Sequence, residues 1–416
     1  MYNFAIHLYA LAVKLVLPFH KKARKMYSGQ QQTFALLQEK IDPESEYIWF
    51  HASSLGEFEQ GRPMIEEIRR RYPRYKILLT FFSPSGYEVR KNYEGADLVC
   101  YLPFDKKENV KKFLDLAKPS FAIFIKYEFW ANYLTELRRR HVPTYIISAI
   151  FRKEQVFFKW YGSEYRKVLH CFDRLFVQDE ASRGLLADYG VTNVSVTGDT
   201  RFDRVVDVRK HAKLLPLIEK FVVSGNAGKC ITMVAGSSWP EDEKILLEYF
   251  NRHPEMKLIV APHEIHTEHL QYIESLVKRP VVRFSDARED SVSRADCLII
   301  DSFGLLSSIY RYGDLAYIGG GFGAGIHNVL EAAVYGIPVL FGPKYQKFKE
   351  AKDLIVAGGG FSVSDGRTFE ERMDELLVYK EVLDTAGRAA GDFVTRYVGV
   401  TDRILKELPV QGNFIF

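Results

Sequence analysis

Short apolar runs alternate with amphipathic stretches along most of this chain, and this alternation limits its possible folds more than any other feature. Runs of roughly four to eight apolar residues are typical of buried strands, whereas apolar residues at helical spacing indicate amphipathic helices. Strands that alternate with helices form parallel sheets with helices on both faces. In the first half of the chain this pattern predicts strands at residues 47–51, 77–82, 98–102, 121–126, 144–149, 175–178 and 195–197.

A second series of the same kind follows a charged helical stretch at residues 204–229, which ends in a Gly- and Ser-rich cluster typical of a connection. A chain of 416 residues is also longer than one hydrophobic core usually serves. We therefore predict two doubly wound α/β domains whose strand ends open toward a central cleft. The strands predicted for the second domain are residues 231–235, 257–261, 281–284, 297–300, 315–318 and 338–341.

The predicted domain boundaries follow from the break in this pattern. A short N-terminal segment covers residues 1–25, a first Rossmann-like domain 26–210, a linker 211–229, and a second Rossmann-like domain 230–416. The last helix of the chain is a candidate for packing back on the first domain.

Charge is distributed unevenly over the chain. Residues 1–210 carry 34 Lys and Arg against 25 Asp and Glu, whereas the remainder carries 23 against 28. A basic first half indicates an anionic partner, such as phosphate, nucleic acid or a membrane surface, or else ordinary solvated faces.

The N-terminal segment favours the membrane. Residues 1–19 are mostly apolar, but His7, Lys14 and Pro18 interrupt them, so the run is too short and too broken to span a bilayer. A basic cluster at residues 20–25 follows the apolar run, whereas a signal peptide carries its charge before it. We expect an in-plane helix on an anionic cytoplasmic leaflet. The alternative is a helix packed against the protein's own core.

Polar residues follow several predicted strands of the first half. In HASSLGE, residues 51–57, small residues precede Glu57 at the start of a predicted helix. A Glu at this position is more often a helix cap than a catalyst, but as a base it could take a proton from a substrate hydroxyl. The segment KYEFW at residues 126–130 and the turn TGDTRFD at residues 197–203 also follow strands. Parallel strands end at one edge of a sheet, so these segments are expected near one another.

The second half carries segments typical of phosphate or nucleotide binding. GSSWP at residues 236–240 and DSFG at 301–304 each follow a strand, and GGGFGAGIHNVLE at 319–331 is a Gly-rich turn between a strand and a helix. A dinucleotide fingerprint fits poorly, because the next strand ends in Gly342 rather than in an acid. A nucleotide-sugar site, with Glu331 accepting hydrogen bonds from ribose, is favoured.

Six segments, in this order, resemble those of the bacterial 3-deoxy-D-manno-octulosonic acid (Kdo) transferases: HASSLGE, KYEFWAN, TGDTRFD, GSSWPEDE, DSFGLL and GGGFGAGIHNVLEAAVYGIPVLFGPKYQKFKEA. The resemblance spans nearly the whole chain, including the N-terminal segment. It implies a GT-B fold and inverting transfer of Kdo from CMP-Kdo to a lipid A precursor of the lipid IVA type, in lipopolysaccharide synthesis. It also implies no metal or cofactor, no nucleic-acid partner, and a peripheral place among anionic lipids on the cytoplasmic face of the inner membrane.

The resemblance assigns roles to particular residues. Glu57 matches the family's proton acceptor, in a motif that also includes His51. Glu128 and Arg201 match residues thought to help the transition state. The acceptor or loop positions are Ser53, Ser54 and Gly56. The expected donor-binding residues are Ser237, Pro262, His263, Phe303, Gly304, Leu305, Asn328, Val329, Leu330 and Glu331.

The sequence departs from the family pattern at several positions. Lys126, Tyr127 and Ala131 replace the Glu, Thr and Pro of the family's ETELWPN segment. His263 stands where an Arg is expected, and a neutral imidazole is a weaker phosphate clamp than a guanidinium. Arg201 replaces a Lys, which keeps the charge but changes the hydrogen-bond geometry.

Two other functions compete with this interpretation. Another GT-B nucleotide-sugar enzyme, such as a UDP-sugar transferase or an epimerase, would share the late Gly-rich turn and the helix-borne Glu. The HASSLGE segment and the N-terminal helix argue against an epimerase, whose substrate is soluble. A non-catalytic basic membrane-binding protein would not need the set of strand-end motifs. Stabilisation by CMP but not by UDP would separate a Kdo transferase from another GT-B nucleotide-sugar enzyme.

Overall fold

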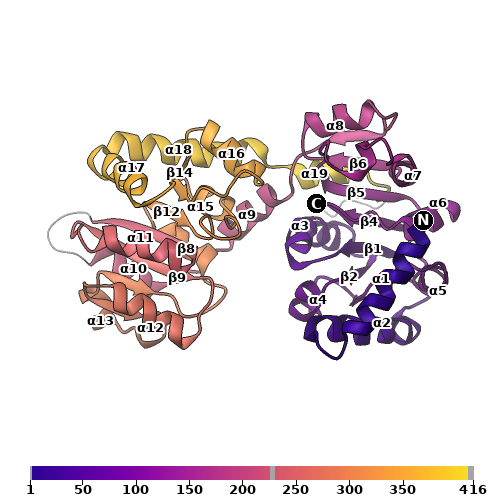
Figure 1. Ribbon diagram of the computed structural model, residues 1–416, viewed down its shortest axis with the longest axis horizontal. Helices are drawn as coiled ribbons and strands as arrows, with labels where there is room; N and C mark the ends of the chain where they lie inside the picture. The colour runs from indigo at the N-terminus through magenta and orange to yellow at the C-terminus, as the bar shows by residue number, and fades with distance from the viewer. Residues whose placement is uncertain (1, 225–229, 411–416) are drawn as a thin grey trace. The chain divides into compact units, whose positions relative to one another are not determined.

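The computed structural model describes residues 2–224 and 230–410, and the chain divides into two compact units (Figure 1). Unit 1 is Met1–Arg204 with Gly399–Phe416, and unit 2 is Val205–Val398. Each unit has one parallel sheet with helices packed around it, so the prediction of two doubly wound α/β domains is confirmed.

The sheet of unit 1 has the strand order β3-β2-β1-β4-β5-β6-β7, and all its neighbouring strands are parallel. Its central strands are buried along their whole length because helices cover both faces. The order reverses between β1 and β4, which makes their carboxyl ends the switch point where α/β sheets bind ligands. The strands are β1 Tyr47–Ala52, β2 Lys76–Phe81, β3 Leu98–Tyr101, β4 Phe121–Ile125, β5 Thr144–Ala149, β6 Arg174–Val177 and β7 Val194–Val196.

Helices of unit 1 pack on the sheet through two separate groups of buried side chains. One group joins the sheet to α2, α5 and α6, and the other joins it to α3 and α19. The helices are α1 Tyr2–Val16, α2 Lys21–Lys40, α3 Leu55–Arg71, α4 Pro84–Arg90, α5 Lys107–Ala117, α6 Ala131–Arg139, α7 Ser163–Arg166, α8 Glu180–Ala187 and α19 Val400–Leu405, with 3-10 turns η1 Val156–Phe158 and η2 Lys167–Cys171.

The sheet of unit 2 has the order β10-β11-β9-β8-β12-β13-β14, again with parallel neighbours and a switch point, here between β8 and β12. The strands are β8 Ile231–Ser238, β9 Met256–Pro262, β10 Val281–Arg283, β11 Cys297–Ile299, β12 Leu315–Ile318, β13 Val339–Phe341 and β14 Gly360–Ser362. The helices are α10 Pro216–Val223, α11 Pro240–Phe250, α12 Thr267–Leu276, α13 Glu289–Arg294, α14 Leu306–Ile309, α15 Leu330–Ala333, α16 Lys349–Val356, α17 Gly366–Val378 and α18 Lys380–Tyr397, with 3-10 turns η3 Phe284–Asp286 and η4 Tyr310–Tyr312.

The prediction that residues 211–229 form a linker is wrong for residues 211–224, the part of this range that the structure describes. The units divide after Arg204, inside α9 (Arg201–Lys210), and α10 packs on α13 as part of unit 2. Two apolar side chains of α10 are completely buried, and the buried amine of Lys257 donates to the carbonyl of Phe221 at 2.5 Å. The Gly-rich cluster predicted to end this stretch lies at residues 225–228, outside the described residues.

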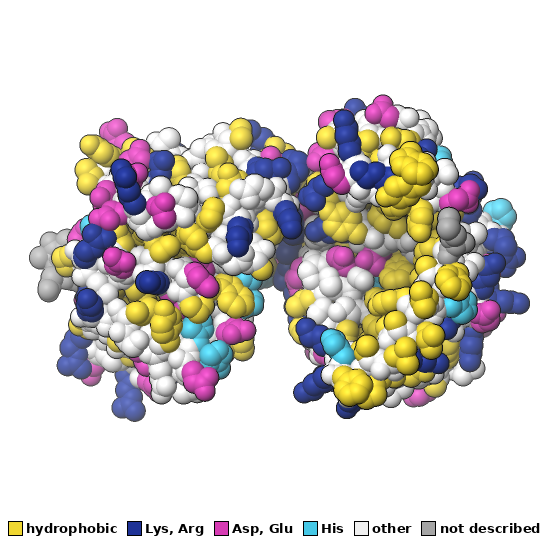
Figure 2. All heavy atoms as spheres, in the orientation of Figure 1, with side chains coloured by type: hydrophobic (Ala, Val, Ile, Leu, Met, Phe, Trp, Pro, Cys, Tyr) yellow, Lys and Arg dark blue, Asp and Glu magenta, His cyan; other side chains and the backbone are white. Residues whose placement is uncertain are grey.

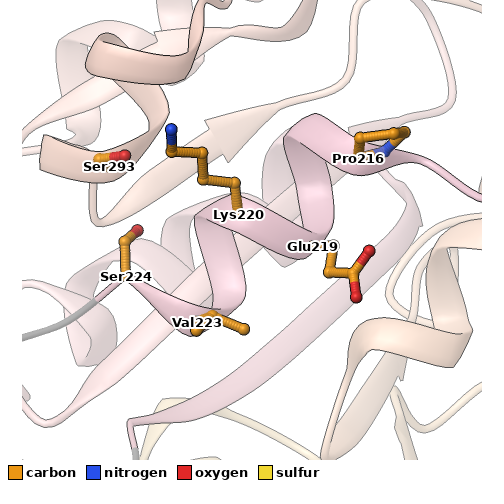
Figure 3. Close-up of a pocket in the computed structure, with 6 residues that line it drawn as sticks. All are labelled: Pro216, Glu219, Lys220, Val223, Ser224 and Ser293. Atoms are coloured by element: carbon orange, nitrogen blue, oxygen red, sulfur yellow. The ribbon is translucent and has the colours of Figure 1, made fainter.

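A shallow hollow of about 460 Å³ marks the place where α10 meets α13 (Figure 3). It is lined by Pro216, Glu219, Lys220, Val223, Ser224 and Ser293. Lys220 forms an ion pair with Glu289 at 2.6 Å. None of the residues singled out from the sequence lines this hollow.

The last helix, α19, belongs to unit 1 and returns the chain to its sheet. Its side chains Val400, Ile404 and Leu405 are buried in the group that includes α3. The carboxylate of Asp203 fixes its start by accepting from the backbone N–H groups of Gly399 at 2.5 Å and Thr401 at 2.6 Å.

The apolar N-terminal segment forms α1, which is followed by α2. Ala10 and Val13 of α1 are buried beside Tyr101 and Phe104, so one side of this helix packs on the protein's own core. The other side exposes Phe4, Leu8, Leu11 and Leu15. Among the described helices, none alone has the length and apolar character of a membrane span; α1 and α2 together reach both, but they meet at a bend of 119°.

Candidate active site

The ends of β1 and β4 bring together two motifs that lie far apart in the sequence. In the sheet, His51 of β1 lies opposite Phe124 of β4. The segments that follow these strands, 53–57 and 126–130, therefore leave the same edge at the switch point. This arrangement bears out the expectation that strand-end motifs of the first half meet.

A buried His–Glu–Trp cluster lies at this edge. His51 is completely buried, and its Nε2 lies 3.0 Å from Oε2 of Glu128, which is 6% exposed. The indole Nε1 of Trp130 lies 2.6 Å from the same carboxylate oxygen and 3.0 Å from His51 Nε2. A carboxylate accepts but cannot donate, so both ring nitrogens direct their protons at Glu128.

Thr80 of the neighbouring strand β2 sets the orientation of the His51 ring. Its hydroxyl oxygen accepts from Trp49 Nε1 at 2.8 Å and lies 2.9 Å from His51 Nδ1. Nδ1 also lies 3.2 Å from the backbone carbonyl oxygen of Thr80, and the Thr80 hydroxyl donates to the carbonyl of Phe50 at 3.3 Å. These contacts hold the ring with Nε2 facing Glu128.

Glu57 lies beside this cluster, in the first turn of α3. Its Oε2 accepts from the backbone N–H of Ser54 at 2.9 Å and from the Ser54 hydroxyl at 3.2 Å, so it caps the helix. Burial raises the pKa of Glu57 and the negative charge of Glu128 raises it further, against the opposing effect of the Ser54 hydrogen bonds. Glu57 therefore caps the helix and, because its pKa is raised, is also a stronger base than an ordinary Glu.

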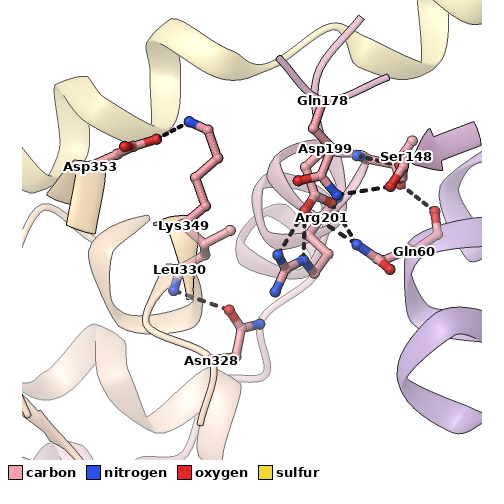
Figure 4. A network of polar contacts seen from close by, with 10 residues as sticks. Gln60, Ser148, Gln178, Asp199, Arg201, Asn328, Leu330, Lys349 and Asp353 are labelled. Atoms are coloured by element: carbon pink, nitrogen blue, oxygen red, sulfur yellow. Dashed lines mark hydrogen bonds and ion pairs between the residues drawn. The ribbon is translucent and has the colours of Figure 1, made fainter. Parts of the chain in front are cut away.

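Arg201 is held by a carboxylate that the sequence analysis did not assign (Figure 4). Asp199 accepts from Arg201 Nε at 2.9 Å and Nη2 at 2.7 Å, and Gln60 donates to it from the other side at 3.2 Å. Burial alone would raise the pKa of Asp199, but the charge and hydrogen bonds of Arg201 outweigh burial and lower it. The guanidinium is thus oriented by a buried ion pair, and part of its charge is offset.

Close backbone packing explains the Gly-rich turn of unit 2. A Cβ atom on Gly319 would lie 2.2 Å from the carbonyl oxygen of Ser237, and one on Gly321 would lie 2.5 Å from the backbone of Gly342. Ser237 itself has a positive φ of 54°. The ends of β8, β12 and β13 therefore approach so closely that only glycine fits between them.

Asp242 of α11 fixes this turn. Its carboxylate accepts from the backbone N–H of Gly320 at 2.8 Å, from that of Trp239 at 3.0 Å and from the Tyr317 hydroxyl at 2.8 Å. Because the side chain is nearly inaccessible to water, all of these donors are needed to satisfy it. No role was predicted for Asp242.

Three aromatic rings stack beside the Gly-rich turn. The rings of Trp239 and His263 lie 4.7 Å apart with an interplanar angle of 23°, and those of His263 and His327 lie 4.6 Å apart. Trp239 Nε1 donates to His327 Nε2 at 3.3 Å. Burial, and then His263, lower the pKa of His327. His263, which replaces the expected Arg, thus occupies the middle of an aromatic stack.

A hollow of about 520 Å³ opens next to this stack. Trp239 lines it, together with Pro240, Glu264, His266, Glu268, His269 and Tyr272. Phe303, by contrast, is 77% exposed in the loop after β11, which also contains Gly304 and Leu305, and Gly304 has a positive φ of 82°.

Asn328 and Glu331 form one hydrogen-bonded unit at the start of α15. Asn328 accepts from the backbone N–H of Leu330 at 3.1 Å (Figure 4). It also donates to Glu331 Oε1 at 3.1 Å. Val329 and Leu330 are completely buried, so their side chains serve the core and only their backbone could reach a ligand. Pro262 ends β9, directly before His263.

Within residues 2–224 and 230–410, no group of three or more His, Cys, Asp or Glu side chains is arranged to hold a metal ion.

The chain is similar to known transferases along most of its length. Residues 28–204 match the family described as 3-deoxy-D-manno-octulosonic-acid transferase (kdotransferase). The 3-deoxy-D-manno-octulosonic acid transferase of Aquifex aeolicus is 28% identical over 342 residues, covering 80% of this chain and 87% of that protein. The transferase of the same name from Haemophilus influenzae is 25% identical over 377 residues, covering 87% and 86%.

Solved structures of low identity share the fold. The UDP-GlcNAc 2-epimerase of Neisseria meningitidis, bound to UDP-GlcNAc, matches 86% of this chain and 98% of its own with a TM-score of 0.61 at 15% identity. The epimerase of Methanocaldococcus jannaschii matches 88% and 100% with a TM-score of 0.55 at 14% identity. The chain is therefore an α/β protein of the GT-B class.

Within that class, the sequence comparisons point to one family. Residues 28–204 match the Kdo transferase family, and several 3-deoxy-D-manno-octulosonic acid transferases are similar to this chain along most of its length.

The charge of Glu128 can be tested through its effect on Glu57. We expect Glu128→Gln to lower the pKa of Glu57, because the substitution removes the neighbouring negative charge but keeps an acceptor for Trp130. Carbon-13 NMR titration of the Glu57 carboxyl measures this pKa. Glu59→Gln on the same helix is the control, since Glu59 engages Arg90 instead. An unchanged Glu57 titration in Glu128→Gln would mean that the two carboxylates are not electrostatically coupled.

Proposed function

We propose that this chain transfers Kdo from CMP-Kdo to a hydroxyl group of a lipid A precursor of the lipid IVA type. The observation that carries this proposal is the pair of carboxylates, Glu57 and Glu128, at the switch point of unit 1. Similarity to the Kdo transferases supports the identity of the sugar that is transferred. The donor nucleotide and the lipid acceptor are the parts that the proposal adds.

In the proposed reaction Glu57 is the general base. As the acceptor oxygen bonds to the anomeric carbon of Kdo, its proton passes to the Glu57 carboxylate, and the bond to the CMP phosphate breaks with its electron pair on the phosphate. Attack opposite the leaving group inverts the anomeric centre. The charge of Glu128 supports this step, because it makes Glu57 a stronger base. Arg201 would offset charge on the leaving phosphate or on the Kdo carboxylate.

Removal of the base should abolish most of the transfer without unfolding the protein. We expect Glu57→Gln to lower the rate of Kdo transfer by a factor on the order of 10²–10⁴, the usual contribution of general-base catalysis. The amide keeps an acceptor oxygen for Ser54, so the start of α3 stays capped. Transfer is measured by mass spectrometry of the lipid product, and CMP binding checks the fold.

Glu59→Gln serves as the matched control, since it changes a carboxylate two residues away on the same helix. In the parent protein the rate should fall as the pH drops through the raised pKa of Glu57, because the protonated form cannot accept a proton. Near-normal turnover of Glu57→Gln would exclude Glu57 as the base, and Glu128 would be tested next.

Unit 2 is the proposed donor-binding unit. Backbone N–H groups of the Gly-rich turn and the start of α15 suit a phosphate, and the Trp239–His263–His327 stack offers ring edges and faces to the nucleotide. Glu331 is proposed to accept hydrogen bonds from the ribose hydroxyls. His263 takes the position of the expected Arg, so phosphate binding would depend more on the backbone.

Loss of Glu331 should weaken binding of the nucleotide. A hydrogen bond to a charged group contributes about 1.5–3 kcal/mol, so we expect Glu331→Ala to raise the Kd for CMP by roughly 10- to 150-fold. Isothermal titration calorimetry with CMP measures this change. Glu371→Ala, an exposed ion-pair residue of α17, is the control. Unchanged CMP affinity in Glu331→Ala would show that the ribose binds elsewhere.

We further propose that unit 1 attaches peripherally to the anionic cytoplasmic face of the inner membrane. The exposed side of α1 carries Phe4, Leu8, Leu11 and Leu15, and the cluster at residues 20–25 supplies cations directly after it. An apolar stripe with an adjacent basic cluster is the combination that binds anionic bilayer surfaces. A lipid acceptor makes such attachment useful.

A further inference from the structure

The N-terminal helix contacts the segment that carries Glu128 by hydrogen bonds. The hydroxyl of Tyr2 donates to Asp105 Oδ2 at 2.5 Å and accepts from the backbone N–H of Ala131 at 3.3 Å. Asn3 Oδ1 accepts from the side chain of Asn132 at 2.7 Å. Ala131 and Asn132 are the first residues of α6, so the start of α1 is bonded to the start of α6.

Asp105 links these two helices. Its carboxylate is completely buried and caps α6 by accepting from the backbone N–H groups of Asn132 and Tyr133, each at 3.0 Å. Burial raises the pKa of Asp105 to about 6, against the lowering effect of these hydrogen bonds and of the one from Tyr2. Above that pH the carboxylate is ionised, and without the Tyr2 hydroxyl it would lose one of its three donors.

A second connection runs through stacked rings. The ring of Tyr9 on α1 stacks on Phe82, with centroids 6.4 Å apart, and Phe82 contacts Trp130 at 4.7 Å. Trp130 Nε1 in turn donates to Glu128 at 2.6 Å. Two separate paths, one polar and one aromatic, therefore lead from α1 to residues 130–132, which closely follow Glu128 in the sequence.

We propose that α1 is a positioning element of the active site as well as a membrane-facing helix. Tyr2, through Asp105, holds the start of α6, and Tyr9, through Phe82, holds the ring of Trp130. Together they keep Glu128 beside His51 and Glu57. This inference rests on the proposed function only in that one of its tests measures the rate of Kdo transfer. It also means that deletion of residues 1–25 removes part of the site together with the membrane-facing side chains.

The test uses full-length Tyr2→Phe, which removes one hydroxyl, and Tyr9→Leu, which removes one ring. With a detergent-dispersed acceptor we expect each to lower kcat by about 10- to 100-fold, the effect of a small misplacement of a reacting group, with little change in KM for the donor. We also expect the pKa of Glu57 to fall in both, because Glu128 is no longer held close. Tyr27→Phe, the same change on α2, is the control.

Parent-like kcat and an unchanged Glu57 titration in both variants would overturn the proposal and leave α1 with a membrane role alone. The Glu57 titration does not depend on Kdo transfer. A parent protein that transfers no Kdo but shows the shift in both variants would therefore reject the proposed function while supporting the positioning role.

A different observation concerns an exposed aromatic segment of unit 1, residues 152–167, named here the aromatic loop. Trp160 is 92% exposed and Tyr161 57%, with their rings edge to face at 5.4 Å. The loop contains five Lys and Arg against two Glu. The 3-10 turn η2, in which this segment ends, packs on α6, and the first residues of α6 bond to Tyr2 and Asn3 of α1. Figure 2 shows hydrophobic side chains on one face of unit 1, over both α1 and α7.

We infer that the aromatic loop is a second contact with an anionic bilayer, next to α1. Trp and Tyr rings combine an apolar body with a polar group and therefore favour the headgroup region of a membrane. The surplus of cations in the loop complements anionic headgroups. This inference rests on the proposed membrane attachment of unit 1, because the loop extends the surface of α1.

Tryptophan fluorescence tests this contact directly, with vesicles of phosphatidylglycerol and phosphatidylcholine. Trp49 is completely buried and both Trp130 and Trp239 are hydrogen-bonded, so Trp160 is the indole whose surroundings should change. We expect a blue shift and quenching by brominated lipid in the parent, neither of them in Trp160→Phe, and roughly 10-fold weaker vesicle binding by Trp160→Ser. Tyr379→Ser on unit 2, where this Tyr is 60% exposed, is the control.

Vesicle binding by the parent without any change in Trp160 fluorescence would overturn the role of the loop and leave α1 as the contact. Absence of vesicle binding by the parent would overturn both the loop and the proposed attachment. Replacement of the cations at residues 21–25 by Gln distinguishes the two surfaces. This replacement should weaken vesicle binding, whereas the blue shift of Trp160 fluorescence should return at saturating lipid.

Discussion

The buried contact between His51 and Glu128 is the interaction on which the candidate site depends. A carboxylate at 6% exposure is stable in its charged form only if donors replace the lost water, and His51 and Trp130 are those donors. Thr80 fixes the His51 ring, and α1 supports Trp130 through Phe82. The charge retained on Glu128 is then what raises the pKa of Glu57 beyond the effect of burial. The packing and hydrogen bonds around Glu128 thus contribute to the base strength of Glu57.

The second unit has the same architecture, but its candidate site is built from backbone groups. Its strand ends approach so closely that glycine is required at Gly319 and Gly321, and the buried carboxylate of Asp242 holds the resulting turn. Such a turn presents backbone N–H groups rather than side chains, which suits a phosphate-bearing ligand. The candidate sites of the two units therefore differ: side-chain carboxylates form most of the site in unit 1, and backbone groups form most of the site in unit 2.

Apolar runs were enough to predict most strands, because a strand buried on both faces must be apolar throughout. They missed β14, since Gly360–Ser362 contains a single large apolar residue, and they made α10 a linker, since its buried Ile218 and Phe221 lie in a charged stretch. Glu57 was recognisable from its place after a strand. Thr80, Trp130, Asp199 and Asp242 were not, because their partners come from other strands and depend on register. The stack that accommodates His263 likewise joins residues from three separate strand ends.

The measurement that tests the central claim most directly is the fate of the donor. Purified protein would be incubated with a defined lipid IVA acceptor and either CMP-Kdo or UDP-GlcNAc, and all products would be weighed by mass spectrometry. The account predicts that the lipid gains Kdo from CMP-Kdo and that UDP-GlcNAc is returned unchanged. Conversion of UDP-GlcNAc, with no Kdo added to the lipid, would contradict it and favour a UDP-sugar enzyme that shares only the fold.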